Sequence, residues 1–458
     1  MPPTTRDVSG RKCRLSNGYA FSGKRSCNSP CTCDNAVWIR AIARRDDGRI
    51  KALGERAKPR GESDLNVLDW WYGAIGFSIP AAILFTLAMT HVTIVAVTVY
   101  LHRCSAHRAV DLHPALQVFF RAWLWLTTGM VTKEWTAIHR KHHATCETDD
   151  DPHSPQISGL GEILFKGTEY YRAANTPETL AKYGKGTPDD WLERNVFGRF
   201  STTGVVLMLL LDMVLFGTVG IVVWAVQMMW IPFFGAGVIN GVGHYVGYRN
   251  FECPDAARNI VPWGLVIGGE ELHNNHHTYP NSARFSAKPW EIDLGWMYIK
   301  LFAMLRLAKP LYTGPVAMRV AGKSHIDMDT VWAAVNDRAR IMARYAETVV
   351  KPLAEVEIGR GDAAARRMVR RARNVLCRAE RIIRDRDRRD IDAITESSAV
   401  LKTIYEKRLE LTELWNRRNG EELLHGFGKW CSEAEATGIK ALRDFVVYLR
   451  SYSVPVRA

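Results

Sequence analysis

Charged side chains are almost absent from two long stretches of this 458-residue sequence. Residues 73–101 contain no Asp, Glu, Lys or Arg, and residues 202–246 contain only Asp212. A membrane-spanning helix needs about 20 consecutive apolar residues. The first stretch therefore predicts one span, and the second predicts two spans joined by a turn at residues 217–220. We expect an all-α integral membrane helical bundle with about three or four spans.

The sequence also lacks a recognisable cysteine motif. Its nine cysteines are scattered, and the spacing of Cys27, Cys31 and Cys33 matches no zinc pattern. The default compartment is therefore a reduced one, facing the cytoplasm. Residues 1–64 lack the apolar segment that a secretory signal needs after its positive charges. We expect these residues to form a basic, disordered extension.

The formal net charge is +13, with the excess of positive residues mainly in residues 1–64 and 310–458. Basic flanks of a membrane protein and a solvated basic tail explain this distribution better than nucleic-acid recognition. We therefore expect membrane lipid, and no specific nucleic acid, among the partners. If one span precedes the first histidine cluster, residues 1–64 lie across the membrane from the clusters. Either the chain makes a re-entrant turn near Pro80, or residues 1–64 are not part of the working protein.

Nine of the fourteen histidines form four clusters beside the predicted membrane boundaries. Two clusters have the spacing i, i+3 and i+4, which places three side chains on one face of a helix. In the first cluster the two histidines are five residues apart, so on an ideal α-helix they diverge by roughly 140°. They can share a site only if the helix ends or bends between them. The clusters are His102 and His107; His139, His142 and His143; His244; and His273, His276 and His277.

Nine imidazoles exceed the needs of one tetrahedral zinc site but suit two metal ions. Imidazole binds iron, zinc, copper or nickel, and only a redox metal explains a site at the depth of lipid acyl chains. We expect a di-iron centre that activates O2 beside a hydrocarbon tunnel. Metal-bound histidines usually donate their second N–H to a carboxylate or a carbonyl. Asp150, Asp151 and Glu270 are candidates for this role, although a solvated acidic turn explains the two aspartates equally well.

The order of the clusters, HxxxxH, HxxHH, NxxxH and HxxHH, resembles that of the membrane fatty acid desaturase family, specifically its acyl-CoA Δ9 (stearoyl-CoA-type) branch. The adjoining residues 151–153 (DPH) and 273–280 (HNNHHTYP) are also similar to that branch, and the resemblance covers about residues 70–300. It implies that the nine clustered histidines ligate two irons and that Asn240 completes the set through water. It further implies that an acyl-CoA chain gains a cis double bond, at Δ9, while O2 is reduced to water.

The implied reaction consumes two electrons from outside the chain. No segment resembles cytochrome b5 or a ferredoxin cysteine array, so we expect a separate donor such as a ferredoxin, a cytochrome b5 or a reductase. Cations near the clusters could bind the phosphates of CoA or of a lipid headgroup, or could simply be interfacial cations. They do not decide between CoA, phospholipid and acyl carrier protein as the carrier. These cations are Arg103, Arg108, Lys141, Arg249 and Lys288.

Two other functions could use the same histidines. A hydroxylase of acyl or alkyl chains shares the metal chemistry and differs in its product. A membrane metal transporter or sensor needs polar residues along its spans, and the two apolar stretches offer few.

The chain beyond about residue 310 alternates charged and apolar residues, which predicts three or four amphipathic helices that pack on one another or on a partner. We expect these helices within residues 330–350, 362–389, 391–418 and 421–450. The predicted division is a basic extension (1–64), a membrane desaturase domain with the metal site in a cytoplasmic cap (65–310), and a basic helical region of unknown role (311–458).

Overall fold

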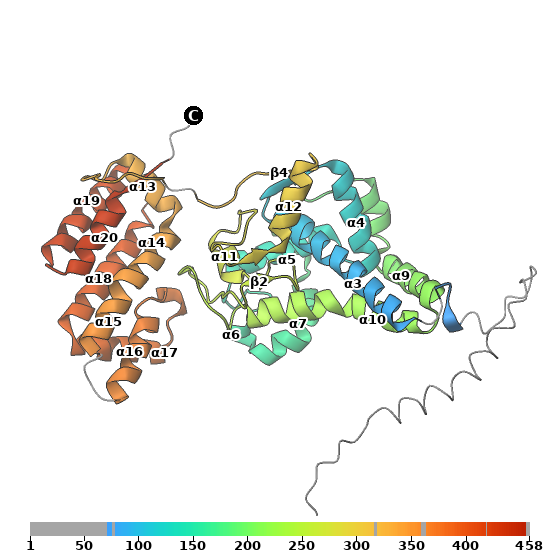
Figure 1. Cartoon of the computed structure of the whole chain (residues 1–458), viewed down its shortest axis with the longest axis horizontal. Coiled ribbons are helices and arrows are strands. Elements are labelled where there is room, and N and C mark those ends of the chain that lie inside the picture. The colour runs from blue at the N-terminus through green and yellow to red at the C-terminus, as the bar shows by residue number, and fades with distance from the viewer. Residues whose placement is uncertain (1–70, 76–77, 316–317, 359–362, 418, 455–458) are drawn as a thin grey trace, which may run out of the picture. The chain divides into compact units, whose positions relative to one another are not determined.

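The computed structural model describes residues 71–75, 78–315, 318–358, 363–417 and 419–454. The predicted basic extension, residues 1–64, lies outside the described residues. The described part is mostly helical and its strands are very short, which agrees with the expected all-α class (Figure 1).

The helices before residue 310 are α3 (Ile79–Val95), the π-helix η1 (Ala96–Ala106), α4 (Pro114–Thr128), α5 (Thr132–Thr145), α6 (Pro155–Ser158), α7 (Leu160–Ala174), α8 (Pro177–Tyr183), the π-helix η2 (Glu193–Phe197), α9 (Ser201–Phe216), α10 (Val219–Trp230), the π-helix η3 (Ile231–Val242), α11 (His273–Thr278) and α12 (Leu294–Met304). The later helices are α13 (Met328–Asn336), α14 (Arg338–Tyr345), the π-helix η4 (Ala346–Val350), α15 (Lys351–Ile358), α16 (Ala363–Val375), the 3₁₀-helix η5 (Glu380–Ile382), α17 (Asp385–Ser397), α18 (Ala399–Leu414), α19 (Gly420–Ala436) and α20 (Lys440–Arg450).

The strands of the described residues form three separate pairs. In the first pair Asp111 lies opposite Lys309, and this antiparallel pairing joins the segment after η1 to the segment after α12. The pairs are β1 (Val110–Leu112) with β4 (Ala308–Pro310), β2 (Trp263–Gly264) with β3 (Ile292–Asp293), and β5 (Met318–Arg319) with β6 (Tyr452–Ser453).

The first apolar stretch forms one long helix, α3 continued by η1. Ser78 caps its N-terminus, because the hydroxyl accepts a hydrogen bond from the backbone N–H of Ala81 at 3.4 Å. Pro80 lies in the first turn, where a proline is tolerated. The helix then continues for 28 residues to Ala106, which is long and apolar enough to cross a membrane. Pro80 therefore lies at the start of this helix, and the structure shows no turn within residues 79–106, which disfavours the alternative of a re-entrant turn near Pro80.

The second apolar stretch divides at the predicted turn. Gly217 has a φ of 60° and ends α9, a conformation that glycine adopts without strain. Beyond the turn, α10 and η3 form a continuous 24-residue helix that is also long enough to span a membrane. In the described part, two helices thus meet this length and composition, fewer than the three or four predicted. The reason is that the glycine turn limits α9 to 16 residues.

The core of the part before residue 310 packs against η1 and α4. Tyr100, Leu101, Phe120 and Leu124 are all almost fully buried there. Helices α7 and η3 approach each other closely because the residues at their contact are glycines, which have no side chain. A Cβ atom at Gly237 would lie 2.5 Å from the carbonyl oxygen of Leu164, so only glycine permits this contact.

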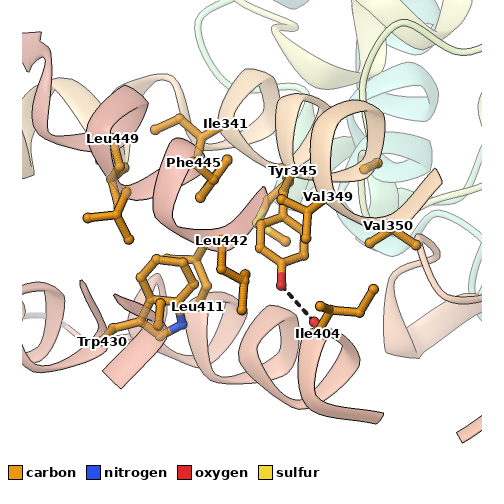
Figure 2. Close-up of a cluster of buried hydrophobic side chains, with 14 of the residues drawn as sticks. Ile341, Tyr345, Val349, Val350, Ile404, Leu411, Trp430, Leu442, Phe445 and Leu449 are labelled. Carbon is orange, nitrogen blue, oxygen red and sulfur yellow. Dashed lines mark hydrogen bonds between the residues drawn. The ribbon is translucent and has the colours of Figure 1, made fainter. Parts of the chain in front are cut away.

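The helices after residue 320 pack on one another, as predicted, around an apolar core of their own. Figure 1 shows these helices, coloured orange to red, gathered into one bundle. Figure 2 shows the core, where Tyr345 packs with Phe445 and Trp430 and its hydroxyl donates a hydrogen bond to the carbonyl of Ile404 at 2.7 Å. The helices are more numerous than the three or four predicted. Ser398, for example, caps the start of α18 within a predicted continuous segment.

Candidate metal centre

The π-helical winding of η1 brings together the two histidines that an α-helix would separate. In a π-helix each backbone N–H bonds to the carbonyl five residues earlier, so residues five apart lie on the same face. The N–H of His107 donates to the carbonyl of His102 at 3.1 Å. Their ring centroids are 4.9 Å apart. His102 and His107 therefore share a face without the helix ending or bending between them, because the helix is a π-helix at this point.

The other seven histidines reach the same region from three elements. As the i, i+3, i+4 spacing predicts, α5 carries one histidine triplet and α11 carries the other. His244 follows the end of η3. All nine divide into two groups within which the candidate ligand nitrogens lie within 4.8 Å of one another. The first group is His102, His107, His139, His143 and His276, and the second is His142, His244, His273 and His277.

The spacing of the nitrogens within each group fits shared metal ions. Metal–imidazole bonds of about 2.1 Å, the length known for zinc, place neighbouring ligand nitrogens about 3 Å apart. In the first group, the Nε2 atoms of His102 and His276 are 3.0 Å apart. In the second group, the Nε2 atoms of His244 and His273 are also 3.0 Å apart. Both groups therefore have the dimensions of a metal site.

Unpartnered nitrogens support the same assignment. The Nε2 atoms of His142 and His277 are buried and have no hydrogen-bond partner within the described residues. Leaving a buried polar atom without a partner costs free energy, so such atoms usually mark a ligand or a function. Since the opposite nitrogen of each ring contacts a carboxylate, the free Nε2 atoms are available to a metal.

Carboxylates orient one ring nitrogen of four histidines. Each pair joins a histidine Nδ1 atom to a carboxylate oxygen, an arrangement that fixes the ring and leaves Nε2 for a metal. The distances are 2.5 Å for His102 and Glu270, 2.9 Å for His142 and Asp151, 3.1 Å for His277 and Asp255, and 3.4 Å for His244 and Glu147.

Two of the three carboxylates singled out in the sequence, Asp151 and Glu270, thus contact histidines. Asp150 is exposed and contacts no histidine in the described structure, so the structure gives no support to the supporting role and fits the solvated acidic turn. Sequence reasoning missed Asp255, because it follows a proline in a loop far along the chain from α11. Glu147 belongs to the acidic segment after α5 whose members the sequence offered as candidates for this role.

Burial keeps most of these rings neutral, the form that binds metals. Burial, together with the neighbouring histidines, holds the pKa of His139, His143 and His276 well below its ordinary value. His142 differs. Burial lowers its pKa, but three nearby carboxylates, Asp151 first and then Asp255 and Glu147, more than offset this and raise the pKa above the ordinary value. A carboxylate partner of this kind also increases the basicity of a metal-bound imidazole.

An apolar cavity of about 120 Å³ adjoins the histidines. Most of its wall is hydrocarbon, including Val97, Ile138 and Ile239. Its polar lining includes cluster histidines of both groups, Glu270 and Asn240. Asn240 lines the cavity together with His273 of the second group. A small apolar space that ends at a histidine cluster is suited to an acyl chain.

Comparison with known proteins identifies the family. Residues 78–291 match the family model described as fatty acid desaturase. Over 229 residues the chain is 32% identical to the sn-1 stearoyl-lipid 9-desaturase of Synechocystis sp., an alignment that covers 48% of this chain and 68% of that protein. This chain belongs to the fatty acid desaturase family.

Other relatives of this desaturase differ in what their names say they act on. The sn-1 stearoyl-lipid 9-desaturase of Anabaena variabilis is 29% identical over 218 residues, covering 46% of this chain and 76% of that protein. The hex-5-enoyl-[acyl-carrier protein] acetylenase of Moorena producens is 30% identical over 246 residues, covering 50% of this chain and 75% of that protein. The family makes this desaturase an oxidoreductase of lipid metabolism that is associated with membranes.

The part after residue 311 matches a different family. Residues 312–458 match the family model described as transposase. The match begins just after β4 ends at Pro310. Sequence reasoning did not find this similarity, because alternating charged and apolar residues predict helices without indicating their family.

Two of the five cations proposed for a substrate headgroup are unavailable in this desaturase. Arg103 is fully buried and forms an ion pair with Asp293 at 2.8 Å. Arg249 donates hydrogen bonds to the carbonyls of Asp255, Ala257 and Cys253 and thereby holds their loop together. Both guanidinium groups stabilise the fold, so the structure gives no support to a headgroup contact by either residue.

The other three cations are more accessible. Arg108 and Lys288 are exposed, and Lys141 is half-buried. Arg108 has a φ of 51° and makes only a long contact, 3.5 Å, to the carbonyl of Lys185. These three side chains could still reach an anionic headgroup.

Proposed function

We propose that this chain is an O2-dependent di-iron desaturase that introduces a cis double bond at the Δ9 position of a fatty acyl chain. The observation that carries the proposal is the division of nine histidines, seven of them buried and two half-buried, into two groups beside an apolar cavity. The names of the relatives from Synechocystis and Anabaena support the Δ9 position.

The proposed metal ligands are the nine histidines, one ion for each group. The second group has one histidine fewer than the first, and Asn240, four residues before His244, would complete it through water. Bound iron would supply the redox chemistry that activates O2. The carboxylates of Glu147, Asp151, Asp255 and Glu270 would hold the rings in place.

In the overall reaction, –CH2–CH2– and O2 become –CH=CH– and two water molecules. Two protons and two electrons complete the balance, and the electrons come from a separate donor protein. The apolar wall around Val97, Ile138 and Ile239 would hold the acyl chain in one orientation and keep bulk water away from the reacting carbons.

We propose a lipid-linked acyl chain as the substrate, in place of the acyl-CoA that the sequence resemblance implied. The names of two relatives support this choice, because the desaturases from Synechocystis and Anabaena are named as acting on lipid-linked chains. Arg108, Lys141 and Lys288 remain as candidates for a lipid headgroup.

The proposed domain division follows the hydrophobic cores. Residues 65–310 would form the desaturase domain, with its histidine clusters facing the cytoplasm, and residues 311–458 would form a second domain. The two large cores support the division because they share no residue.

The experiment is expression of the full chain in a host that supplies an electron donor, followed by gas chromatography–mass spectrometry of each lipid class. A new cis-9 monounsaturated chain in the glycerolipids, before it appears in acyl-CoA, supports the proposal. His273→Ala should abolish the product, whereas His425→Ala, at an exposed histidine of α19, should not. Hydroxylated chains would indicate the hydroxylase instead. Iron uptake without any modified lipid would indicate a metal transporter or sensor.

A further inference from the structure

One face of α16 carries an unusual concentration of positive charge. The helix contains five arginines and no acidic residue. Its other face is apolar, and Val369, Ala372 and Val375 are buried in the core of the C-terminal helices. Because the apolar face must remain buried, the arginines project to the surface. They are Arg366, Arg367, Arg370, Arg371 and Arg373.

Three of these arginines lack an acidic partner. Arg373 pairs with Glu355 at 2.6 Å, and Arg371 approaches Asp390 at 3.5 Å. Within the described residues, Arg366, Arg367 and Arg370 form no ion pair, and all three are exposed.

This arrangement disfavours the helix unless an anion compensates it. Arg366 and Arg370 are separated by one helical turn, and like charges at that spacing are destabilising. They also line a shared surface hollow together with Val369 and Glu355. In the neighbouring helix α17 this repulsion is compensated within the helix, because its three arginines alternate with four aspartates.

The covalent connection to the desaturase domain limits how far α16 can move from the membrane, and so determines which anions lie within its reach. Residues 311–327 join β4 to α13, and even fully extended they reach no more than about 60 Å. The C-terminal helices are therefore tethered close to the bilayer that holds the desaturase domain. A tether raises the effective concentration of a nearby binding surface without any additional contact.

We propose that Arg366, Arg367 and Arg370 bind the anionic headgroups of that bilayer. Guanidinium groups form paired hydrogen bonds with phosphate oxygens, and clustered arginines beside a membrane segment favour anionic lipid. The proposal rests on the membrane location of the chain and is independent of its substrate. Duplex DNA offers similar phosphates and is the alternative that the test must exclude. We favour lipid because the tether keeps α16 near the membrane.

The test uses the full chain in nanodiscs of phosphatidylcholine, which is zwitterionic. Immobilised vesicles of phosphatidylcholine, with or without phosphatidylglycerol, are then offered in a surface plasmon resonance measurement. Native protein should bind the vesicles with phosphatidylglycerol more tightly, and added salt should weaken this binding. The triple variant R366Q/R367Q/R370Q should bind them on the order of 100-fold more weakly, because each arginine near an anionic surface contributes about fivefold.

The matched control removes the same number of charges from α17, in the variant R386Q/R388Q/R389Q. This control should retain most of the binding to phosphatidylglycerol, because the arginines of α17 lie among aspartates. Neither variant should unfold at a lower temperature than the native chain, which would show that the substitutions leave the fold intact. Three outcomes overturn the proposal: native-like binding by the α16 variant, an equal loss in the α17 control, or tighter binding of duplex DNA than of phosphatidylglycerol vesicles.

Discussion

The two helical parts of this chain bury very different side chains. The part before residue 310 buries histidines, aspartates, glutamates and Arg103 at its centre. Among the described residues after 320, the buried polar side chains are only Thr330, Asp337, Arg408 and Ser453. Burying polar groups costs free energy unless each finds a partner. The part before residue 310 therefore spends stability on a functional site, whereas the core after residue 320 mainly stabilises the fold.

In the core before residue 310, part of the free-energy cost of burying polar groups comes from histidine nitrogens that have no partner in the described structure. The buried Nε2 atoms of His142 and His277 have no partner among the described residues. A bound metal would satisfy these atoms, so metal binding should stabilise the desaturase part. We expect no such dependence in the C-terminal core. The predictions that follow use this difference, beginning with the largest effect.

Removal of one ligand histidine should abolish activity and metal binding together. His276→Ala removes a nitrogen from the first group, and we expect loss of iron and of the unsaturated product. Iron is measured by mass spectrometry of the purified chain. His425→Ala is the control, and its iron content should equal that of the native chain. Normal iron and normal product in His276→Ala would remove this residue from the site.

Substitution in the C-terminal core should affect stability without affecting the metal. Phe445 is almost fully buried among Tyr345 and Trp430 (Figure 2). Phe445→Ala should cost about 3–5 kcal/mol in the free energy of unfolding of these helices. Hydrogen exchange of the full chain measures this loss helix by helix. Val447→Ala, at an exposed position of the same helix, should change stability by less than about 0.5 kcal/mol.

If Phe445→Ala also emptied the metal site, the separation between the two cores would be wrong. Unchanged iron with weakened protection of α18, α19 and α20 would confirm it.

Removal of one supporting carboxylate should weaken the metal site without destroying it. Asp255→Asn removes the charge that faces Nδ1 of His277. We expect iron affinity or activity to fall by about 10–100-fold, as for other residues that orient metal ligands. Competition with a chelator measures the affinity. Asp150→Asn, at an exposed acid of the segment after α5, should have the native affinity, and an equal loss there would contradict the account.

The smallest predicted effect concerns the close contact of α7 with η3. A Cβ atom at Gly167 would lie 2.9 Å from the carbonyl oxygen of Ala236, and Gly167 also lines the cavity. Gly167→Ala should destabilise the desaturase part by about 1–3 kcal/mol and shift its products toward shorter chains. Product analysis and thermal unfolding measure the two effects.

Gly161→Ala is the control on the same helix, because a Cβ atom there meets no atom within 4 Å. Its effect on stability should be below about 1 kcal/mol. Equal effects of the two substitutions would show that helix propensity, and not the contact with η3, determines the result.

Local patterns predicted those features that depend on local chemistry. The i, i+3, i+4 spacing of the histidines predicted the faces of α5 and α11, because a helix repeats in a fixed way. The turn at Gly217 followed from glycine in an apolar stretch. The histidines were expected to share a site because randomly placed residues would not gather beside the membrane boundaries.

Features that depend on distant parts of the chain could not be predicted in the same way. The π-helical winding of η1 arises where that helix packs, and no short motif marks it. Asp255 reaches His277 only because a loop folds back. Arg103 was a candidate for a headgroup contact or an interfacial cation, but it is buried against Asp293, which is far along the chain.

The number of iron ions per chain tests the central claim most directly. The full native chain is purified without chelators, loaded with Fe²⁺ in the absence of O2 and freed of excess iron. Its iron is then measured against its protein concentration. The two histidine groups predict two irons per chain, with both ions released by a strong chelator. A content of one iron, or of none, would contradict the account.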